Sequence, residues 1–330
     1  MDDAPLLEIK DLHVHFHVYG GILRVLDGVS FVVHRGEKVG LVGETGCGKT
    51  TTMKATLRVL PMPPARIPGG QILFQGQDLL KMRDDRLRRV RGRGISMIFQ
   101  DPTAALNPVF TIGQQIRAVV RHSTEKRLSR SQIHDRMIQP IREVALPDPE
   151  RMLGSYPIQL SGGMRQRVCI AMALVADPKL LIADEPGTSL DVTIQDQILR
   201  LLGRLVEEKD LSVILITHTL GIVRQLTDRV YVMYAGTMVE VAGTEELFRN
   251  PLHPYTHGLM EAVPRLTGGG VSDGIPGRIP NYLHPPPGCR FHPRCPHVMD
   301  VCRQEKPGFY RVSGDHEVAC FLYRDKERSA

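Results

Sequence analysis

One short segment has the residue types and the spacing of a phosphate-binding loop. The stretch "GETGCGKT" fits the pattern G-x-x-x-x-G-K-S/T, with Gly43, Gly48, Lys49 and Thr50 in its fixed positions. Glycines let consecutive backbone N–H groups curl around phosphate oxygens, the lysine neutralises the β and γ phosphates, and the threonine offers a hydroxyl to Mg²⁺. An apolar run precedes the loop and a helical pattern follows it, so the segment predicts a nucleoside triphosphate site. The other members expected to line it are Glu44, Thr45, Gly46, Cys47 and Thr51.

Two adjacent carboxylates end an apolar run much further along the chain. In "KLLIADEP" the run finishes at Asp184 and Glu185. P-loop enzymes place an acid that binds Mg²⁺ at such a strand end, and the next carboxylate can reach a water in line with the γ phosphate. Acids at a strand end can also be no more than a helix cap. The P-loop upstream favours the catalytic interpretation.

A second candidate phosphate cradle lies between these motifs. In "LSGGMRQR", Ser161, Gly162 and Gly163 lead directly into a helical pattern, and a helix N-terminus presents N–H groups and a positive dipole to an anion. One chain cannot easily bring two separate cradles to the same nucleotide. The sequence therefore predicts two chains that face each other.

The elements that must position these residues follow from the alternation of the sequence. Residues 7–33 predict antiparallel strands at the edge of a sheet, and residues 112–175 are predominantly helical in pattern. The runs "LLIADEP" and "VILITH" are strand-like and a helical stretch separates them, which indicates a parallel sheet with helices on its faces. After about residue 250 the chain is rich in Pro and Gly, which is typical of a linker, and it leads into a Cys-containing tail.

The order of the motifs resembles that of the ABC ATPases. "LSGGMRQR" resembles the signature motif, "IFQDPTAALNP" the Q-loop, "SLD" at Ser189–Asp191 the D-loop, and "LITH" the segment that carries the switch histidine. The resemblance implies an α/β P-loop NTPase core with a mixed sheet, an antiparallel β subdomain and an inserted helical subdomain, followed by a small Cys-rich C-terminal extension. The expected boundaries are 1–250 for the nucleotide-binding domain, about 101–168 for the helical subdomain and 251–330 for the extension.

The resemblance also implies roles for single residues. Two ATP molecules with Mg²⁺ would be held in a head-to-tail dimer, each between the P-loop of one subunit and Ser161–Gly163 of the other. Glu185 would be the general base, His218 would hold the γ phosphate and the water in line, and Gln100 would complete the Mg²⁺ shell or position the water. His218 by itself would more often be an ordinary strand-end histidine. The D-loop would contribute Asp191 at the interface between subunits.

An aromatic residue ahead of the P-loop usually stacks on adenine in this family. Tyr19 stands at roughly the right distance from the loop. The branch carries a variable insertion there, so Ile22, Leu23 and Arg24 are the alternatives.

Longer stretches of the sequence resemble one branch of the ABC ATPases. "IFQDPTAALNPVFTIGQQI" and "LIADEPGTSLDVTIQDQIL" resemble the ATP-binding subunits of dipeptide and oligopeptide importers, and "SGGMRQRV" favours the D-type subunit. The implied partners are two transmembrane permeases, a homologous F-type ATPase or a second copy as the other half of the dimer, and an extracytoplasmic solute-binding protein, with no nucleic acid. The implied place is the cytoplasmic face of the inner membrane, as a peripheral subunit. Nickel chelates and sugars remain alternative substrates, and a soluble ABC ATPase that is not a transporter remains the more distant alternative.

The composition agrees with a two-part cytosolic protein. The chain has 330 residues with a net charge of +6, and its longest apolar runs are of strand length. The start "MDDAPLLEIK" lacks the pattern of a secretory signal, which favours the reducing cytosol. The basic stretch "KMRDDRLRRVRGRG" predicts either a solvated helical face or a contact with anionic lipid or an acidic partner.

Four cysteines in the tail raise the question of a metal. Cys289, Cys295, Cys302 and Cys320 have the spacing C-x5-C-x6-C-x17-C, which lacks the close pair that structural zinc sites usually contain. Four thiolates on a loop-rich segment suit a 4Fe-4S cluster, and the resemblance adds weight because the tails of this branch show such a Cys pattern together with a cubane cluster. Zinc is the lesser alternative, and thiols without a metal are the third. The histidines that keep zinc open are His292, His297 and His316.

Overall fold

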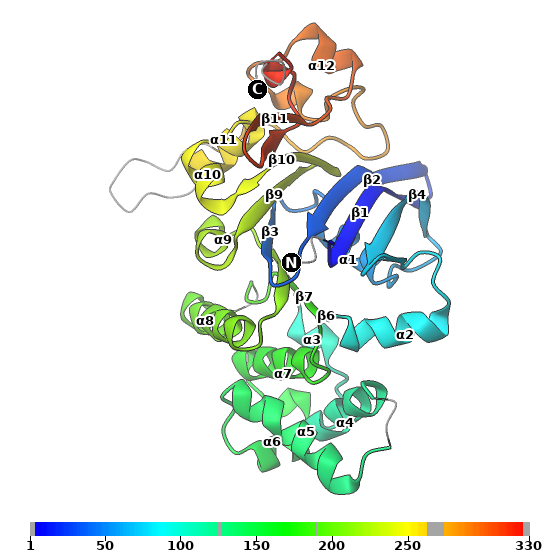
Figure 1. Cartoon of the computed structure of the whole chain (residues 1–330), viewed down its shortest axis with the longest axis vertical. Helices are drawn as coiled ribbons and strands as arrows, with labels where there is room; N and C mark the ends of the chain where they lie inside the picture. The colour runs from blue at the N-terminus through cyan, green and yellow to red at the C-terminus, as the bar shows by residue number, and fades with distance from the viewer. Residues whose placement is uncertain (1–3, 125–126, 189, 263–273, 326–330) are drawn as a thin grey trace. The chain divides into compact units, whose positions relative to one another are not determined.

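The computed structural model describes residues 4–124, 127–188, 190–262 and 274–325 (Figure 1). The chain forms two compact units, one made of Met1–Leu80 with Ile216–Ala330 and the other of Lys81–Leu215. Within the ranges just given, no helix has both the length and the apolar character needed to cross a membrane.

The first unit contains an antiparallel sheet near the N-terminus. Its strands are β1 (Leu7–Val18), β2 (Gly21–Val33), β4 (Ala65–Phe74) and β5 (Gln77–Asp78). They run in the order β2-β1-β4-β5, and the three longer strands lie side by side in Figure 1. Apolar residues alternate with polar ones along β1, so one face of the strand is buried and the other is half-exposed. The predicted antiparallel strands over residues 7–33 are therefore confirmed.

A second group of strands in the same unit carries the P-loop. β3 (Lys38–Val42) pairs in parallel with β9 (Arg229–Tyr234), and β9 pairs with β10 (Thr237–Gly243) in an antiparallel hairpin. All the apolar residues of β3 and β9 are buried, as expected for strands that are covered on both faces. The P-loop leaves the end of β3 and enters α1 (Lys49–Thr56). α9 (Leu220–Leu226) precedes β9 in the chain, and α10 (Thr244–Arg249) follows β10.

The C-terminal tail joins this second group of strands instead of forming a separate lobe. β12 (His316–Val318) pairs antiparallel with β10, and β11 (Tyr310–Ser313) pairs with β12. The tail also contains α11 (Pro254–Glu261) and α12 (Asp300–Gln304). Because β10 belongs to the core and β12 to the tail, backbone hydrogen bonds connect the two parts.

The described residues of the second unit are mostly helical and include the strands β6, β7 and β8. β6 (Ile95–Ile98) and β7 (Leu180–Asp184) pair in parallel, and β8 (Ser212–Ile216) is the other neighbour of β7. Between β6 and β7 the described residues form helices and loops. The helices of this unit are α2 (Asp84–Arg93), α3 (Pro102–Ala105), α4 (Ile112–His122), α5 (Arg130–Glu143), α6 (Pro149–Gly154), α7 (Gly162–Leu174) and α8 (Val192–Glu208).

Candidate nucleotide-binding site

The glycines of the P-loop occupy positions that no other residue fits. Gly43 has a φ of 150°, and a Cβ there would lie 2.1 Å from the carbonyl oxygen of Met233. Gly48 has a φ of 110°, and its Cβ would lie 2.7 Å from a methyl group of Leu26. The loop therefore needs glycine for both its backbone conformation and its packing. This geometry lets the backbone approach a phosphate closely.

The start of α1 fits an anion. Gly48 is the N-cap residue and offers no side-chain cap, so no side chain of the cap competes for the first N–H groups of the helix. Lys49 is only 5% exposed, and its Nζ donates to the carbonyl oxygens of Gly43 at 2.7 Å and Glu44 at 3.0 Å. The ammonium group thus lies inside the curve of the loop. The residues present fit a triphosphate, with Lys49 as the counter-charge.

Cys47 belongs to the P-loop, and its side chain is buried. Its carbonyl oxygen accepts a hydrogen bond of 2.7 Å from the N–H of Gly236 in the β9–β10 turn. Its side chain is 0% exposed, and burial raises the pKa of the thiol although the Lys49 ammonium acts in the opposite direction. Cys47 is therefore a packed, neutral thiol at neutral pH.

This burial makes a prediction about thiol reactivity. At about pH 8, iodoacetamide should label Cys47 of the folded protein more slowly than the half-buried Cys295, because alkylation needs an accessible thiolate. Peptide mapping of the labelled protein by mass spectrometry measures both rates. In urea the two cysteines should react alike, and faster labelling of Cys47 than of Cys295 in the folded protein would contradict the expected burial.

The second unit brings together two of the predicted catalytic residues. Asp184 ends β7 and is 1% exposed, and Glu185 follows it with a φ of 46°. A positive φ is uncommon for a residue with a side chain, and at a strand end it redirects the chain sharply. Oε2 of Glu185 accepts a hydrogen bond of 3.0 Å from Nε2 of Gln100, 85 residues earlier in the chain. The amide of Gln100 therefore orients the carboxylate of Glu185.

The predicted signature residues lie at the start of α7. Oγ of Ser161 accepts the N–H of Met164 at 3.3 Å and so caps this helix. A Cβ on Gly162 would lie 3.0 Å from Leu190, and one on Gly163 would lie 2.8 Å from Ile194. The glycines thus permit the start of α7 to pack closely against the start of α8.

Three further predicted residues lie at a helix start, after a strand end and in a turn. Asp191 accepts the N–H of Ile194 at 2.9 Å and caps α8, whereas its D-loop neighbour Ser189 lies outside the described residues. His218 is exposed and lies two residues after the end of β8, with Thr217 between them. Tyr19 is fully exposed in the turn between β1 and β2. A stacking role for Tyr19 stays a prediction.

Three side chains of the C-terminal tail contact the P-loop, and the motifs gave no indication of them. The hydroxyl of Tyr255 accepts the N–H of Glu44 at 2.8 Å, and the hydroxyl of Tyr282 donates to the carbonyl oxygen of Gly46 at 2.7 Å. Arg294 donates to both oxygens of the Glu44 carboxylate, at 2.8 and 3.1 Å. The available signal was weak: aromatic residues make up only 5% of the chain, and several of them lie in this Pro-rich tail.

The prediction of a 4Fe-4S cluster is wrong, and so is zinc as its alternative. Among the described residues, no group of three or more His, Cys, Asp or Glu side chains could hold a metal ion. Burial raises the pKa of Cys289 to about 11 and that of Cys320 to about 12, so both groups are neutral thiols in this structure.

The cysteines pack instead as small apolar side chains. Cys289 and Cys295 contact the core cluster that contains Tyr255 and Phe291, and Cys320 packs with the cluster around Leu252. Cys302 is 7% exposed, and its carbonyl oxygen accepts the N–H of Cys289 at 2.9 Å. Three of the four tail cysteines thus contact two different apolar clusters. Cys169, outside the tail, is 8% exposed on α7.

Comparison with known proteins agrees with the motifs. Residues 26–188 match the family model described as ABC transporter, and residues 239–302 match the one described as oligopeptide/dipeptide transporter, C-terminal region. The chain is 46% identical over 327 residues to the dipeptide transport ATP-binding protein DppD of Bacillus subtilis, covering 98% of this chain and 97% of that one. It is 44% identical to the oligopeptide transport ATP-binding protein OppD of the same organism, covering 96% and 88%.

Solved structures show the same fold. CbiO1 of Clostridium perfringens, part of the ABC transporter complex cbiONQ, has a TM-score of 0.62 at 26% identity and covers 75% of this chain and 92% of its own. The ATP-binding cassette MJ0796, solved as a dimer in a post-hydrolysis state, has a TM-score of 0.64 at 24% identity and covers 72% and 98%. The predicted ABC ATPase fold is therefore confirmed.

The comparisons also correct one partner and establish the family. Neither DppD nor OppD is named as an F-type subunit, so the prediction of such a partner is wrong in that form. Identity of 42–46% to several peptide-transport ATP-binding proteins extends over nearly the whole chain. The chain therefore belongs to the ATP-binding subunits of the dipeptide and oligopeptide ABC transporters, and it is an ATPase that binds ATP with Mg²⁺ and acts as a peripheral subunit at the cytoplasmic face of the membrane.

Proposed function

We propose that the chain energises the import of dipeptides or oligopeptides as a head-to-tail dimer of two copies, working with two transmembrane permeases. The observation that carries the peptide assignment is the combination of a complete set of ATPase motifs with a tail matched by the oligopeptide/dipeptide transporter model. The relatives named as dipeptide and oligopeptide transport proteins support this substrate class. A solute-binding protein outside the membrane would deliver the peptide to the permeases.

The P-loop would bind the triphosphate. Lys49 would neutralise the β and γ phosphates, and the N–H groups at the start of α1 would donate hydrogen bonds to phosphate oxygens. Thr50, Gln100 and Asp184 would hold Mg²⁺, which neutralises charge on the phosphates. The start of α7, at Ser161–Gly163, would close on the ATP of the partner copy, with Asp191 near the interface.

Hydrolysis would depend on the pair formed by Glu185 and Gln100. The hydrogen bond from Gln100 orients the Glu185 carboxylate, which would accept a proton from the attacking water. His218 would hold the γ phosphate in line. The rate enhancement comes from positioning and from charge neutralisation.

The pair gives a prediction for Gln100→Ala. We expect kcat for Mg-dependent ATP hydrolysis to fall about tenfold, because the Glu185 carboxylate loses one orienting hydrogen bond. Gln139→Ala is a matched control, since Gln139 is exposed on α5 and bonds only to Glu143 at 3.2 Å in the described contacts. Steady-state phosphate release measures both variants. Unchanged turnover in Gln100→Ala would show that Gln100 does not orient Glu185 for hydrolysis.

The same proposal includes a division of the chain into two domains. Residues 1–250 would form the nucleotide-binding domain, with a helical subdomain at about 101–168 that faces the permeases, and residues 251–330 would form the extension. The match of the transporter C-terminal model to residues 239–302 supports an extension that is specific to peptide importers.

Transport is tested with membranes that contain the cognate permeases. Tagged full-length chain incubated with solubilised membranes should retain two permeases, and the reconstituted complex should accumulate a labelled dipeptide only when MgATP is present. Accumulation of a nickel chelate or a sugar, and not of a peptide, would show that the chain serves an importer for that other substrate. Recovery of ribosomes or DNA without a permease would overturn the transport role.

A further inference from the structure

The C-terminal extension reaches the P-loop through a charged side chain that none of the ATPase motifs includes. Arg294 and Glu44 are 250 residues apart in sequence, yet the guanidinium binds both oxygens of the carboxylate, at 2.8 and 3.1 Å. The side chain of Arg294 is 4% exposed and that of Glu44 is 29% exposed. A bidentate pair of this kind fixes orientation as well as distance, and it is stronger than neutral hydrogen bonds.

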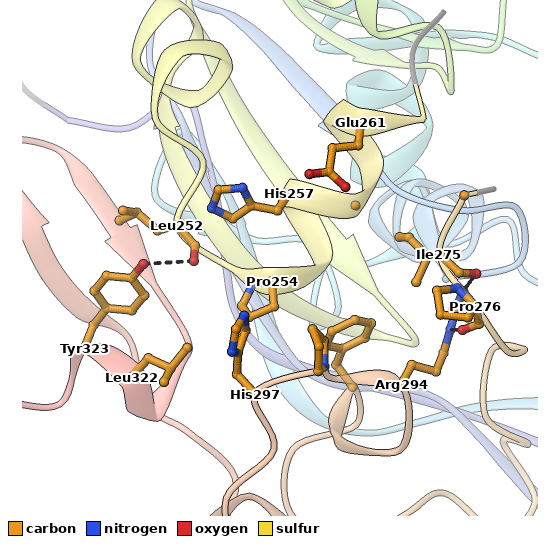
Figure 2. Close-up of a pocket in the computed structure, with 14 residues that line it drawn as sticks. Leu252, Pro254, His257, Glu261, Ile275, Pro276, Arg294, His297, Leu322 and Tyr323 are labelled. Carbon is orange, nitrogen blue, oxygen red and sulfur yellow. Dashed lines mark hydrogen bonds between the residues drawn. The ribbon is translucent and has the colours of Figure 1, made fainter. Parts of the chain in front are cut away.

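Arg294 is itself held in place by the backbone of the extension. Its Nε donates to the carbonyl oxygen of Pro276 at 2.8 Å and its Nη2 donates to that of Ile275 at 2.9 Å, as Figure 2 shows. Arg294 also lines a cavity of about 490 Å³, and these hydrogen bonds fix its direction there. Burial acts to lower the pKa of Arg294, but the hydrogen bonds with Glu44 and Tyr234 outweigh it and hold the pKa above its usual value.

The segment that carries Arg294 is anchored by aromatic packing. The ring of Phe291 lies 5.0 Å from that of Tyr234 at the end of β9 and 5.5 Å from that of Tyr255 on α11. Phe291 is 2% exposed and Tyr255 is 0% exposed. Tyr255 in turn accepts the N–H of Glu44 at 2.8 Å. The residue after Gly43 is therefore held at its backbone and at its carboxylate, both times from the extension.

We infer that Arg294 is a positioning residue for ATP binding: it neutralises and fixes Glu44, and so couples the shape of the P-loop to the C-terminal extension. The inference rests on the proposed ATP site. Without the guanidinium, the carboxylate of Glu44 would stay charged within the loop that receives the phosphates, and like charges there oppose binding. Arg294 acts through Glu44 and has no contact with the reacting atoms.

Binding of a fluorescent ATP analogue with Mg²⁺ to the full-length protein tests the inference. In Arg294→Ala we expect the dissociation constant and the KM for ATP to rise about tenfold while kcat changes little, as for the loss of ground-state binding. In a Glu44→Gln background, Arg294→Ala should raise the dissociation constant for ATP less than about twofold, because the carboxylate that Arg294 neutralises is no longer there. Arg294→Lys should rescue part of the affinity, since it restores the charge without the bidentate geometry.

The control is another arginine of the extension. Arg311 on β11 binds Glu317 at 2.7 Å, so Arg311→Ala removes an ion pair of the tail and should leave ATP binding unchanged. If Arg294→Ala fails to fold, Arg294→Lys, which keeps the long stem, decides the question. Folded variants that bind ATP like the wild type, or equal losses in both Glu44 backgrounds, would overturn the role of Arg294. A wild-type protein that binds no ATP would overturn the proposed function as well.

Discussion

Glu185→Gln should lower the rate of ATP hydrolysis by about 10²- to 10⁴-fold, the typical contribution of a general base. The amide keeps the size of the side chain but cannot accept a proton from water. ATP binding should persist, because Lys49, the counter-charge for the phosphates, is held by the carbonyl oxygens of Gly43 and Glu44. Phosphate release measures the hydrolysis rate, and equilibrium dialysis of ATP measures the binding.

Glu208→Gln is the matched control for this experiment. Glu208 ends α8 in the same unit, and its side chain is 60% exposed beside Arg204. Its loss should leave hydrolysis within about twofold of the wild type, as surface ion pairs contribute little. Hydrolysis by Glu185→Gln at the rate of this control would assign the general base to another residue.

Glu240→Gln should lower the free energy of unfolding of the protein by about 3 kcal/mol, within the range for breaking a buried charged network. Glu240 is 0% exposed on β10. Its two oxygens accept the N–H groups of Leu252 and His253 at 2.7 and 2.8 Å, and Oε1 also lies 2.7 Å from Nε2 of His316. An amide places its NH₂ group against these donors, so at least one buried donor loses its partner.

The matched control for the buried network is Glu246→Gln. The Glu246 side chain is 41% exposed, and its carboxylate is 3.8 Å from Nδ1 of the same histidine, His316. Urea unfolding followed by circular dichroism measures both variants, and the control should change stability by less than about 0.5 kcal/mol. Equal effects of the two substitutions would mean that Glu240 does not anchor the tail to β10.

Local pattern was sufficient to predict the strand, glycine-rich turn and helix around the P-loop. Gly43 and Gly48 are required by the backbone conformation of a single loop, and a strand before it with a helix after it provides the whole context. The alternation of apolar residues predicted β1 and β2 for the same reason. Features that depend on neighbours in sequence are therefore readable from the sequence.

Contacts over long sequence separations could not be predicted in this way. The pair of Arg294 with Glu44 depends on how the tail folds back on β9 and β10, and no local pattern encodes it. For the tail cysteines the sequence predicted a site that the structure does not contain among its described residues. Their spacing suggested a metal, whereas burial and packing make them neutral, apolar side chains. Cys289 and Cys320 enter different apolar clusters. Sequence spacing alone does not distinguish a ligand from a packed thiol.

The mass of the Glu185→Gln protein with MgATP shows whether ATP joins two copies of the chain. A chain of 36.8 kDa that acts as a head-to-tail ATP-dependent dimer should sediment as a species of twice that mass with two bound ATP molecules, and it should return to a monomer when ATP is removed. Lys49→Ala in the same background should remain monomeric, because it lacks the counter-charge for the phosphates. A Glu185→Gln protein that binds ATP yet remains a monomer at all ATP concentrations would contradict the account.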